Sequence, residues 1–217
     1  DYLLEEIAIA ERSLSKKNEF LCKYANIKSS SSTAWLETKT VEKACGEHLN
    51  LDDYRENYCV MGIDLSQTVD LTAVTTVIEK DETMYTFCQY FMPREKIEEA
   101  TAREGLPYNI YVQRGLITPS GENFVDYKDV FNYIIMLIEQ YQILPLMIGY
   151  DRYSSQYLIQ DLTNYGARCD DVYQGENLYG IIQETQGWLE DGKLHIGDND
   201  LLKMHLLNSA IKMSAER

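Results

Sequence analysis

The sequence lacks the residue patterns that build thiolate metal sites and disulfide frameworks. Its five cysteines are scattered along the chain and form no CxxC pair. This distribution argues against a zinc site and against a disulfide-stapled domain, and it fits a reducing cytoplasm. The sequence also has no apolar run of about 18 residues, so we expect no membrane span.

Basic residues are scarce as well. The chain has 20 Lys and Arg against 35 Asp and Glu, which gives a formal net charge of −15. A nucleic-acid-binding domain usually carries a basic patch, so this balance counts against a simple DNA-binding module. A strongly acidic body can favour solubility, repel DNA or concentrate divalent cations, and taken alone the composition favours the first of these, solubility.

The N-terminal residues have none of the marks of a targeting segment. The chain starts with DYLLEEIAIAERSL, which has no Met, no basic leader and no cleavage site, so we expect a fragment of a longer protein rather than a signal peptide. Apolar residues at helical spacing predict a helix over residues 1–20, and the serine run at 29–32 is typical of a linker. A further helix is predicted near residues 37–46. We therefore divide the chain into a helical linker, residues 1–54, and a main domain, residues 55–217.

The main domain begins with three predicted strands. YCVMGID, residues 58–64, is a continuous apolar run that ends in an aspartate. LTAVTTVIEK, residues 71–80, is rich in β-branched residues, and TMYTFCQYFM, residues 83–92, follows after a short turn. Short joints between consecutive strands predict an antiparallel meander.

Helices alternate with strands over the rest of the chain. A charged helix is predicted from Pro93 to Gly105, followed by an irregular aromatic excursion over residues 106–126. An amphipathic helix with Asp126 as its N-cap then leads to LPLMIGYD, a strand that ends at Asp151. Further helices and short strands continue to the end of the chain. This order predicts an α/β fold in which a mixed sheet, part meander and part parallel, is flanked by helices.

Three aspartates follow from this topology as candidate site residues. Asp64 ends the first strand, Asp70 begins its antiparallel neighbour and Asp151 ends a later strand. Aspartates at strand ends are often only turn formers. However, the carboxyl ends of parallel strands in open α/β sheets are where sites gather, and crowded carboxylates are stabilised by a divalent cation. With no nearby His or Cys, the oxygen ligands suit Mg²⁺ or Mn²⁺, and two such ions would support phosphodiester cleavage.

Several motifs resemble those of the large subunits of phage terminases, the DNA-packaging motors with a ribonuclease H-like nuclease domain. GIDLSQTVDLTAV is similar to their first nuclease motif, and IGYDRYSSQYLIQDLTNYG resembles their second acidic motif. FMPREKI with the following PYNIYVQRGLITPSGENFVDY is similar to their excursion after the third strand, and VYQGENLYGIIQETQGWLEDGKLHIGDNDLLKMHLLNSA resembles their later region. The resemblance covers about residues 55–210, and it implies a ribonuclease H-like fold.

The resemblance also implies roles for individual residues. Asp64 and Asp151 fall on the first and second metal-binding acids of the family and would be catalytic, and Asp70 falls on an accessory acid. The third metal-binding acid of the family would lie beyond Arg217, so the domain would be truncated before its last acidic motif. Asp198 and Asp200 precede a predicted helix and are better explained as N-cap or first-turn acids.

The function that the resemblance implies is a metal-dependent DNA endonuclease that cuts concatemeric double-stranded viral DNA in the host cytoplasm. Its implied partners are DNA, a portal protein, a small terminase subunit and the ATPase motor domain. The chain has no GxxxxGK[ST] phosphate loop, so that motor is absent from it. Arg152, Lys193 and Lys203, with His195 and His205, are candidate phosphate contacts, although an ordinary solvated surface role is the commoner case for each.

Two alternatives stay open. The chain could be a docking or regulatory module of the packaging motor that is inactive without its third acid, or another ribonuclease H-like nuclease such as a resolvase or transposase.

Overall fold

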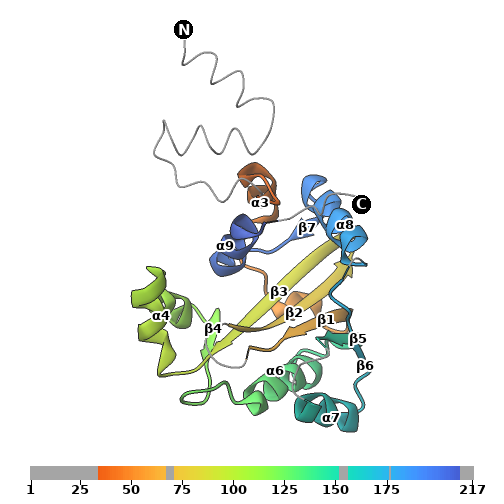
Figure 1. The fold of residues 1–217 in the computed structure, drawn as a ribbon. Coiled ribbons are helices and arrows are strands. Elements are labelled where there is room, and N and C mark those ends of the chain that lie inside the picture. Colours follow the sequence, from red (N-terminus) through yellow and green to blue (C-terminus); the bar gives the residue numbers. More distant parts are fainter. Residues whose placement is uncertain (1–33, 67–70, 152–155, 176, 211–217) are drawn as a thin grey trace.

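A central mixed sheet organises the part of the chain that is described. The computed structural model describes residues 34–66, 71–151, 156–175 and 177–210. Six strands lie in the order β4-β3-β2-β1-β5-β6, and the short β7 pairs separately with β3 (Figure 1). The predicted helix over residues 1–20 and the serine linker lie outside the described residues.

The three predicted strands of the meander are present. They are β1 (Tyr58–Asp64), β2 (Thr72–Lys80) and β3 (Thr83–Met92). Strand β2 pairs antiparallel with both neighbours, with Asp64 opposite Ala73 and Thr72 opposite Phe91. The apolar and β-branched composition of these segments therefore specifies the strands correctly.

Parallel strands extend the sheet on both sides of the meander. On one side, β5 (Leu144–Tyr150) pairs parallel with β1, and β6 (Cys169–Asp171) pairs parallel with β5. On the other side, β4 (Ile117–Pro119) and β7 (Leu194–His195) both pair parallel with β3. The carboxyl ends of β1, β5, β6, β3 and β4 consequently meet at one edge of the sheet.

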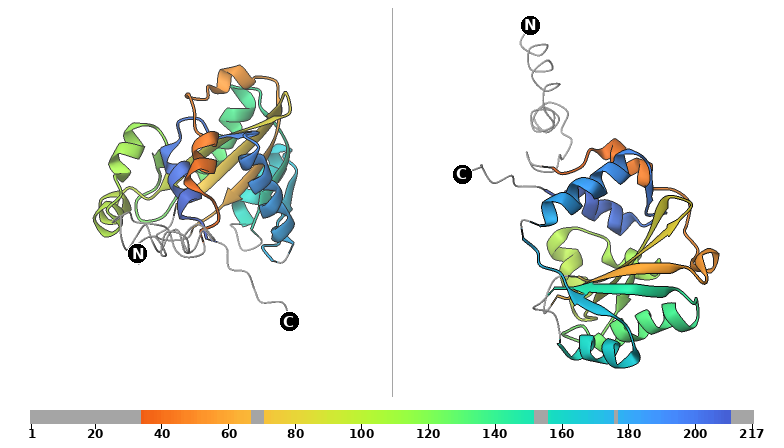
Figure 2. Two further views of the ribbon diagram at one scale, coloured as in Figure 1. Left: turned by 90° about the horizontal axis from the view of Figure 1, so that it is seen from above. Right: turned by 90° about the vertical axis from the view of Figure 1, so that its right-hand side faces the viewer.

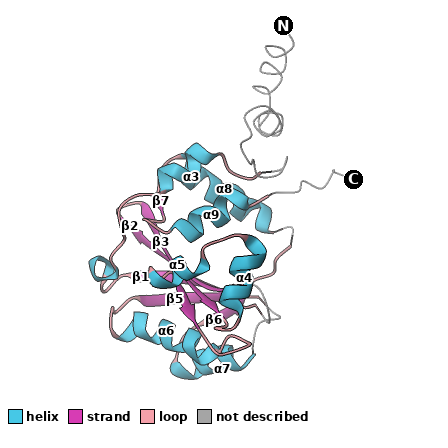
Figure 3. Ribbon diagram, turned by 90° about the vertical axis from the view of Figure 1, so that its left-hand side faces the viewer, coloured by secondary structure: helices cyan, strands magenta, loops and turns pink. Residues whose placement is uncertain are grey.

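Helices pack against both faces of the sheet, and the second face is covered only in part. The amphipathic α6 (Tyr127–Glu139) and α7 (Gln156–Tyr165) lie against the first face (Figure 3). They bury the alternate β1 residues Cys59, Met61 and Ile63. Asp126 caps α6, as predicted, by accepting a hydrogen bond from the Lys128 amide at 3.0 Å. This face holds the main hydrophobic core.

The second face is covered mainly over β3 and β4. There α4 (Lys96–Glu104), α5 (Tyr108–Gln113) and α9 (Asp200–Asn208) bury Cys88, Tyr90 and Met92. Over the β1–β5 half of this face, Tyr58, Val60 and Leu146 are exposed. The excursion predicted as irregular thus contains a short helix, α5, and a short strand, β4; that prediction was wrong because burial of Tyr108, Tyr111 and Ile117 orders it.

A third cluster joins the segment before β1 to the C-terminal helices. Helix α3 (Thr38–Ala44) lies near α8 (Leu178–Glu190) and α9 in all the views (Figures 1 and 2). A 3-10 helix, η1 (Leu51–Tyr54), then leads into β1. Residues 34–54 therefore pack on the domain, while the boundary at residue 55 stays a prediction. Among the described residues, no helix is long and apolar enough to cross a membrane.

Candidate functional site

Two of the predicted carboxylates meet in one cleft. Ile63 of β1 is paired in parallel register with Tyr150 of β5, so Asp64 and Asp151 are the next residues on adjacent strands. Neighbouring strands lie about 4.8 Å apart, which brings the two residues side by side. Both line a cleft of about 270 Å³, and neither is buried beneath apolar packing.

The cleft floor is formed by small residues. Gly62 and Gly149 are paired across β1 and β5, two positions before the carboxylates. A Cβ atom built on Gly62 would meet no heavy atom within 4 Å, whereas one on Gly149 would lie 2.9 Å from Cγ2 of Val172. A glycine in a strand marks a place where a ligand or another backbone can approach closely. The cleft floor therefore has open space at Gly62, beside Asp64 on the same strand.

Hydrogen bonds fix the loop that follows Asp64. The backbone amide of Ser66 donates to Oγ1 of Thr72 at 3.1 Å, and the Tyr127 hydroxyl donates to the Ser66 carbonyl at 3.2 Å. Burial raises the pKa of Tyr127. These contacts tie the end of β1 to β2 and to the start of α6.

The other predicted site residues lie in different places. Asp70 and Arg152 fall outside the described residues. Lys193 precedes β7, and its carbonyl accepts from the Met84 amide at 2.7 Å. Met84 lies six residues along β3 from Tyr90, which is level with Asp64, so Lys193 is about 20 Å from the carboxylates along the strands. Lys203 lies on α9 and does not line the cleft.

The two histidines considered as phosphate contacts both pack against tyrosine rings. His195 stacks on Tyr85 with ring centroids 5.6 Å apart, and His205 lies 5.5 Å from Tyr90. Burial lowers the pKa of His205. Neither ring lines the cleft.

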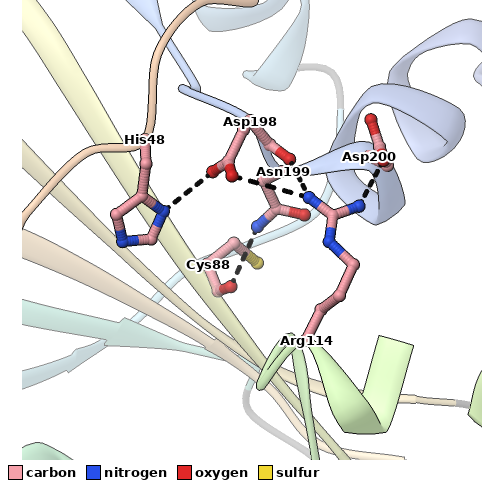
Figure 4. Close-up of polar contacts among 6 residues, drawn as sticks. All are labelled: His48, Cys88, Arg114, Asp198, Asn199 and Asp200. Atoms are coloured by element: carbon pink, nitrogen blue, oxygen red, sulfur yellow. Dashed lines mark hydrogen bonds and ion pairs between the residues drawn. The ribbon is translucent and has the colours of Figure 1, made fainter. Parts of the chain in front are cut away.

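Asp198 and Asp200 belong to a polar cluster elsewhere in the molecule (Figure 4). Both form ion pairs with Arg114, and Asp198 also contacts Nδ1 of His48 at 3.0 Å. Asp200 lies in the first turn of α9, as predicted. The N-cap is Asn199 and Asp198 precedes it, so the prediction of an N-cap or first-turn role was wrong for Asp198. These aspartates therefore join the excursion to α9 and do not complete the cleft.

The donor set of the cleft suits a hard cation but is small. Carboxylate oxygens are the ligands that Mg²⁺ and Mn²⁺ prefer. Within the described ranges, no group of three or more His, Cys, Asp or Glu side chains is placed to hold a metal ion. Among the described residues, the cleft thus offers the carboxylates of Asp64 and Asp151, next to the open space at Gly62.

The cleft extends beyond the carboxylates. Gln174, which follows β6, lines it together with Val172. The glycine floor was missed, because nothing in the sequence shows that Gly62 and Gly149 are paired across two strands.

A mixed sheet of this order, with acidic residues at the ends of two central parallel strands, defines an α/β domain of the ribonuclease H-like class. The structure superposes on the large terminase of bacteriophage HK97 with a TM-score of 0.70 and 21% identity, over 94% of this chain and 42% of that one. It also matches the large terminase nuclease of thermophilic phage G20c with bound magnesium, at a TM-score of 0.52 and 11% identity, over 84% of each chain.

Sequence comparison gives the family. The model of the terminase large subunit endonuclease domain matches residues 3–217, so the chain belongs to that family. The terminase large subunit of Enterobacteria phage HK97 is 24% identical over 182 residues, and that of Lactococcus phage p2 is 24% identical over 216 residues. These alignments cover 82% and 97% of this chain but 35% and 39% of the relatives, so the chain spans little more than a third of their length. The family match favours a terminase over a resolvase or transposase.

Proposed function

We propose that this domain is a metal-dependent endonuclease that cuts concatemeric double-stranded DNA during viral packaging in the host cytoplasm. The observation that supports this best is the meeting of Asp64 and Asp151 in one cleft at the ends of adjacent parallel strands. Membership of the terminase nuclease family supports the choice of DNA as substrate. The full protein would work with a motor domain, a portal protein and a small terminase subunit.

In this proposal Asp64 and Asp151 hold Mg²⁺ or Mn²⁺, in a site for two ions, and Asp70 assists. Such ions polarise a phosphodiester and lower the pKa of water that attacks it. The protein's own contribution is placement: two strand ends hold the carboxylates side by side, and Gly62 and Gly149 leave room for a substrate backbone to reach them. Gln174 lies at the cleft wall, where its amide can donate to a phosphate oxygen.

The test compares matched aspartate variants in metal binding and DNA cutting. Asp64→Asn and Asp151→Asn should each weaken Mn²⁺ binding at least about 100-fold in calorimetry, because each removes a charged ligand. The same variants in the full-length protein should stop nicking plasmid DNA. Asp81→Asn, at the β2–β3 turn on the far end of the sheet, is the control and should behave as wild type. Unchanged Mn²⁺ binding and cutting by Asp64→Asn would reject the proposal.

A second candidate is a docking or regulatory module that keeps the fold without the chemistry. It is favoured by the two-carboxylate cleft of the described residues and by the net charge of −15. The same calorimetry distinguishes the two functions, since a docking module would show no Mn²⁺ binding that depends on Asp64 or Asp151.

A further inference from the structure

A groove of about 690 Å³ lies on the second sheet face, toward the opposite end of β1 from the carboxylates. Its floor includes Tyr58 and Val60 of β1 and Leu146 of β5, which are 62%, 51% and 56% exposed. Tyr58, Val60 and Asp64 alternate onto the same face of β1, so the groove opens on the same side of the sheet as the cleft. Large exposed apolar side chains that share one groove mark a contact surface.

Helix α8 forms a wall of this groove through Trp188 and is fixed in place by hydrogen bonds. The Lys193 amide donates to the Trp188 carbonyl at 2.8 Å, and Nε1 of Trp35 donates to Oε1 of Gln186 at 3.1 Å. Trp188 also packs against the buried cluster that joins α3 to α8 and β7. The groove is thus formed before a partner arrives, which lowers the free-energy cost of binding one.

The rim of the groove is acidic. The lining residues include Glu56, Glu79, Asp81 and Glu82, all of them exposed, and no Lys or Arg. Within the described part of the chain, none of these four carboxylates forms an ion pair. An apolar floor with acidic edges is complementary to a partner whose apolar residues are flanked by Lys and Arg.

The strand pairing favours a helix as the occupant of the groove. Strand β1, which supplies part of the floor, is already paired with β2 on one side and with β5 on the other, so a strand of the partner has no free edge of β1 to join. A partner must therefore contact the floor through its side chains. A helix with one apolar stripe is an element that packs in this way on an open sheet face.

We propose that the groove binds a basic amphipathic helix of a partner protein. Its apolar stripe would lie on Tyr58, Val60 and Leu146, and its Lys and Arg residues would lie beside the acidic rim. This docking function goes beyond the endonuclease activity and does not depend on it, because none of the groove residues lines the cleft. The partner would nevertheless lie near the cleft, since regular strand geometry places the Cα atom of Val60 about 13 Å from that of Asp64.

The test measures binding of a synthetic, fluorescein-labelled helical peptide of Leu and Lys, with all its leucines on one face, to the whole chain. Fluorescence anisotropy should give a dissociation constant of about 10 μM or tighter. A peptide of the same composition with its leucines spread around the helix should bind at least about 10-fold more weakly, because it has no apolar stripe. A peptide of Leu and Glu with the original stripe should also bind at least about 10-fold more weakly, because the acidic rim repels it.

Variants of the floor show whether the peptide occupies the groove. Val60→Thr with Leu146→Gln removes two apolar side chains from the floor and should weaken binding of the Leu–Lys peptide at least about 10-fold. The matched control is Ile110→Gln with Phe124→Gln, which removes two apolar side chains that are 52% and 62% exposed outside the groove. This control should bind the peptide as wild type does.

Variants of the rim test the role of charge. Glu79→Gln with Glu82→Gln should weaken binding at least about threefold and reduce its dependence on NaCl concentration. Glu98→Gln with Glu122→Gln removes two negative charges from exposed positions outside the groove and should keep wild-type binding. Because the rim side chains are exposed and form no ion pair among the described residues, this comparison tests the proposal even if the floor variant fails to fold.

Contrary results would overturn the docking proposal in distinct ways. No binding of the Leu–Lys peptide by the wild-type chain would reject it outright. Equal binding of the two Leu–Lys peptides, or equal losses in the groove and control variants, would show that the net charge of −15 alone attracts the peptide. If the wild-type chain dimerises in sedimentation equilibrium and Val60→Thr with Leu146→Gln abolishes the dimer, the groove is instead an interface between two copies of the chain. None of these results bears on the nuclease proposal, whose test is Mn²⁺ binding and DNA cutting.

Discussion

Single residues determine how much room the cleft has. Gly62 lies two residues before Asp64 on the same, exposed face of β1, and a side chain added there would meet open space. On the same strand and face, Val60 lies two residues farther from Asp64 and does not line the cleft. This pair allows the space inside the cleft to be changed separately from the strand that forms it.

Gly62→Val should fill the cleft without unfolding the domain. Valine favours strands over glycine, so the unfolding free energy should be unchanged or should rise by up to about 1 kcal/mol in urea denaturation. DNA binding in Ca²⁺ should fall at least about 10-fold, because the added methyl groups occupy the space where a substrate backbone would lie. Val60→Leu is the control and should leave DNA binding unchanged. A fully active Gly62→Val would show that substrate does not approach this floor.

His205 should make stability depend on pH. Burial lowers its pKa, opposed in part by Glu104, and its buried Nε2 has no hydrogen-bond partner among the described residues. The unfolded chain therefore binds the proton more tightly, so the unfolding free energy should be highest above about pH 6.5 and should fall as the pH drops below that value. His205→Phe, which keeps a ring beside Tyr90, should reduce this slope between pH 7 and 5 in urea denaturation. Equal slopes in the two proteins would contradict the assignment.

At the level of elements, the sequence predicted those helices and strands whose own residue pattern is strong enough to identify them. The strands of Asp64 and Asp151 were predicted from apolar runs bounded by turns, whereas their parallel pairing as neighbours is a finding of the structure. In contrast, α5 has only 6 residues and β4 only 3, so their own propensity is too weak to identify them. Burial of Tyr108 and Tyr111 orders α5, and β3 supplies the hydrogen bonds of β4.

Asn199 should be the residue on which the docking of α9 depends most. Its Oδ1 accepts from the Leu202 amide at 2.9 Å as the N-cap, and its Nδ2 donates to the Cys88 carbonyl at 3.2 Å (Figure 4). Asn199→Ala removes a cap worth about 1 kcal/mol and a buried hydrogen bond worth about 1 kcal/mol, so the unfolding free energy should fall by about 2 kcal/mol. Asn199→Ser restores only the cap and should lose about half as much.

Urea denaturation checks this order of stabilities. Glu37→Ala is the matched control, since Glu37 is the N-cap of α3 and makes no side-chain capping bond. It should change the unfolding free energy by less than about 0.5 kcal/mol. A fall in Asn199→Ser as large as in Asn199→Ala would show that the contact with β3, rather than the cap, stabilises this junction.

At the level of the whole molecule, an excess of 15 negative charges opposes the approach of DNA. Most of this charge lies away from the cleft, so a cation bound between Asp64 and Asp151 changes the local field far more than the total. We therefore expect DNA affinity to depend on divalent cations acting at the cleft, rather than on general screening.

This expectation can be tested by adding millimolar Ca²⁺ to a duplex-binding assay, with NaCl adjusted to the same ionic strength in the control. Ca²⁺ should raise the affinity at least about 10-fold, because it replaces repulsion at the cleft by attraction to phosphate. The double variant Asp64→Asn with Asp151→Asn should lose this response. The control double variant, Glu79→Gln with Asp81→Asn, also removes two negative charges, but at the far end of the sheet, and should keep the response to Ca²⁺. If both double variants respond alike, the ion acts on the overall charge; if only the cleft variant fails, the two strand ends are where the cation and the DNA meet.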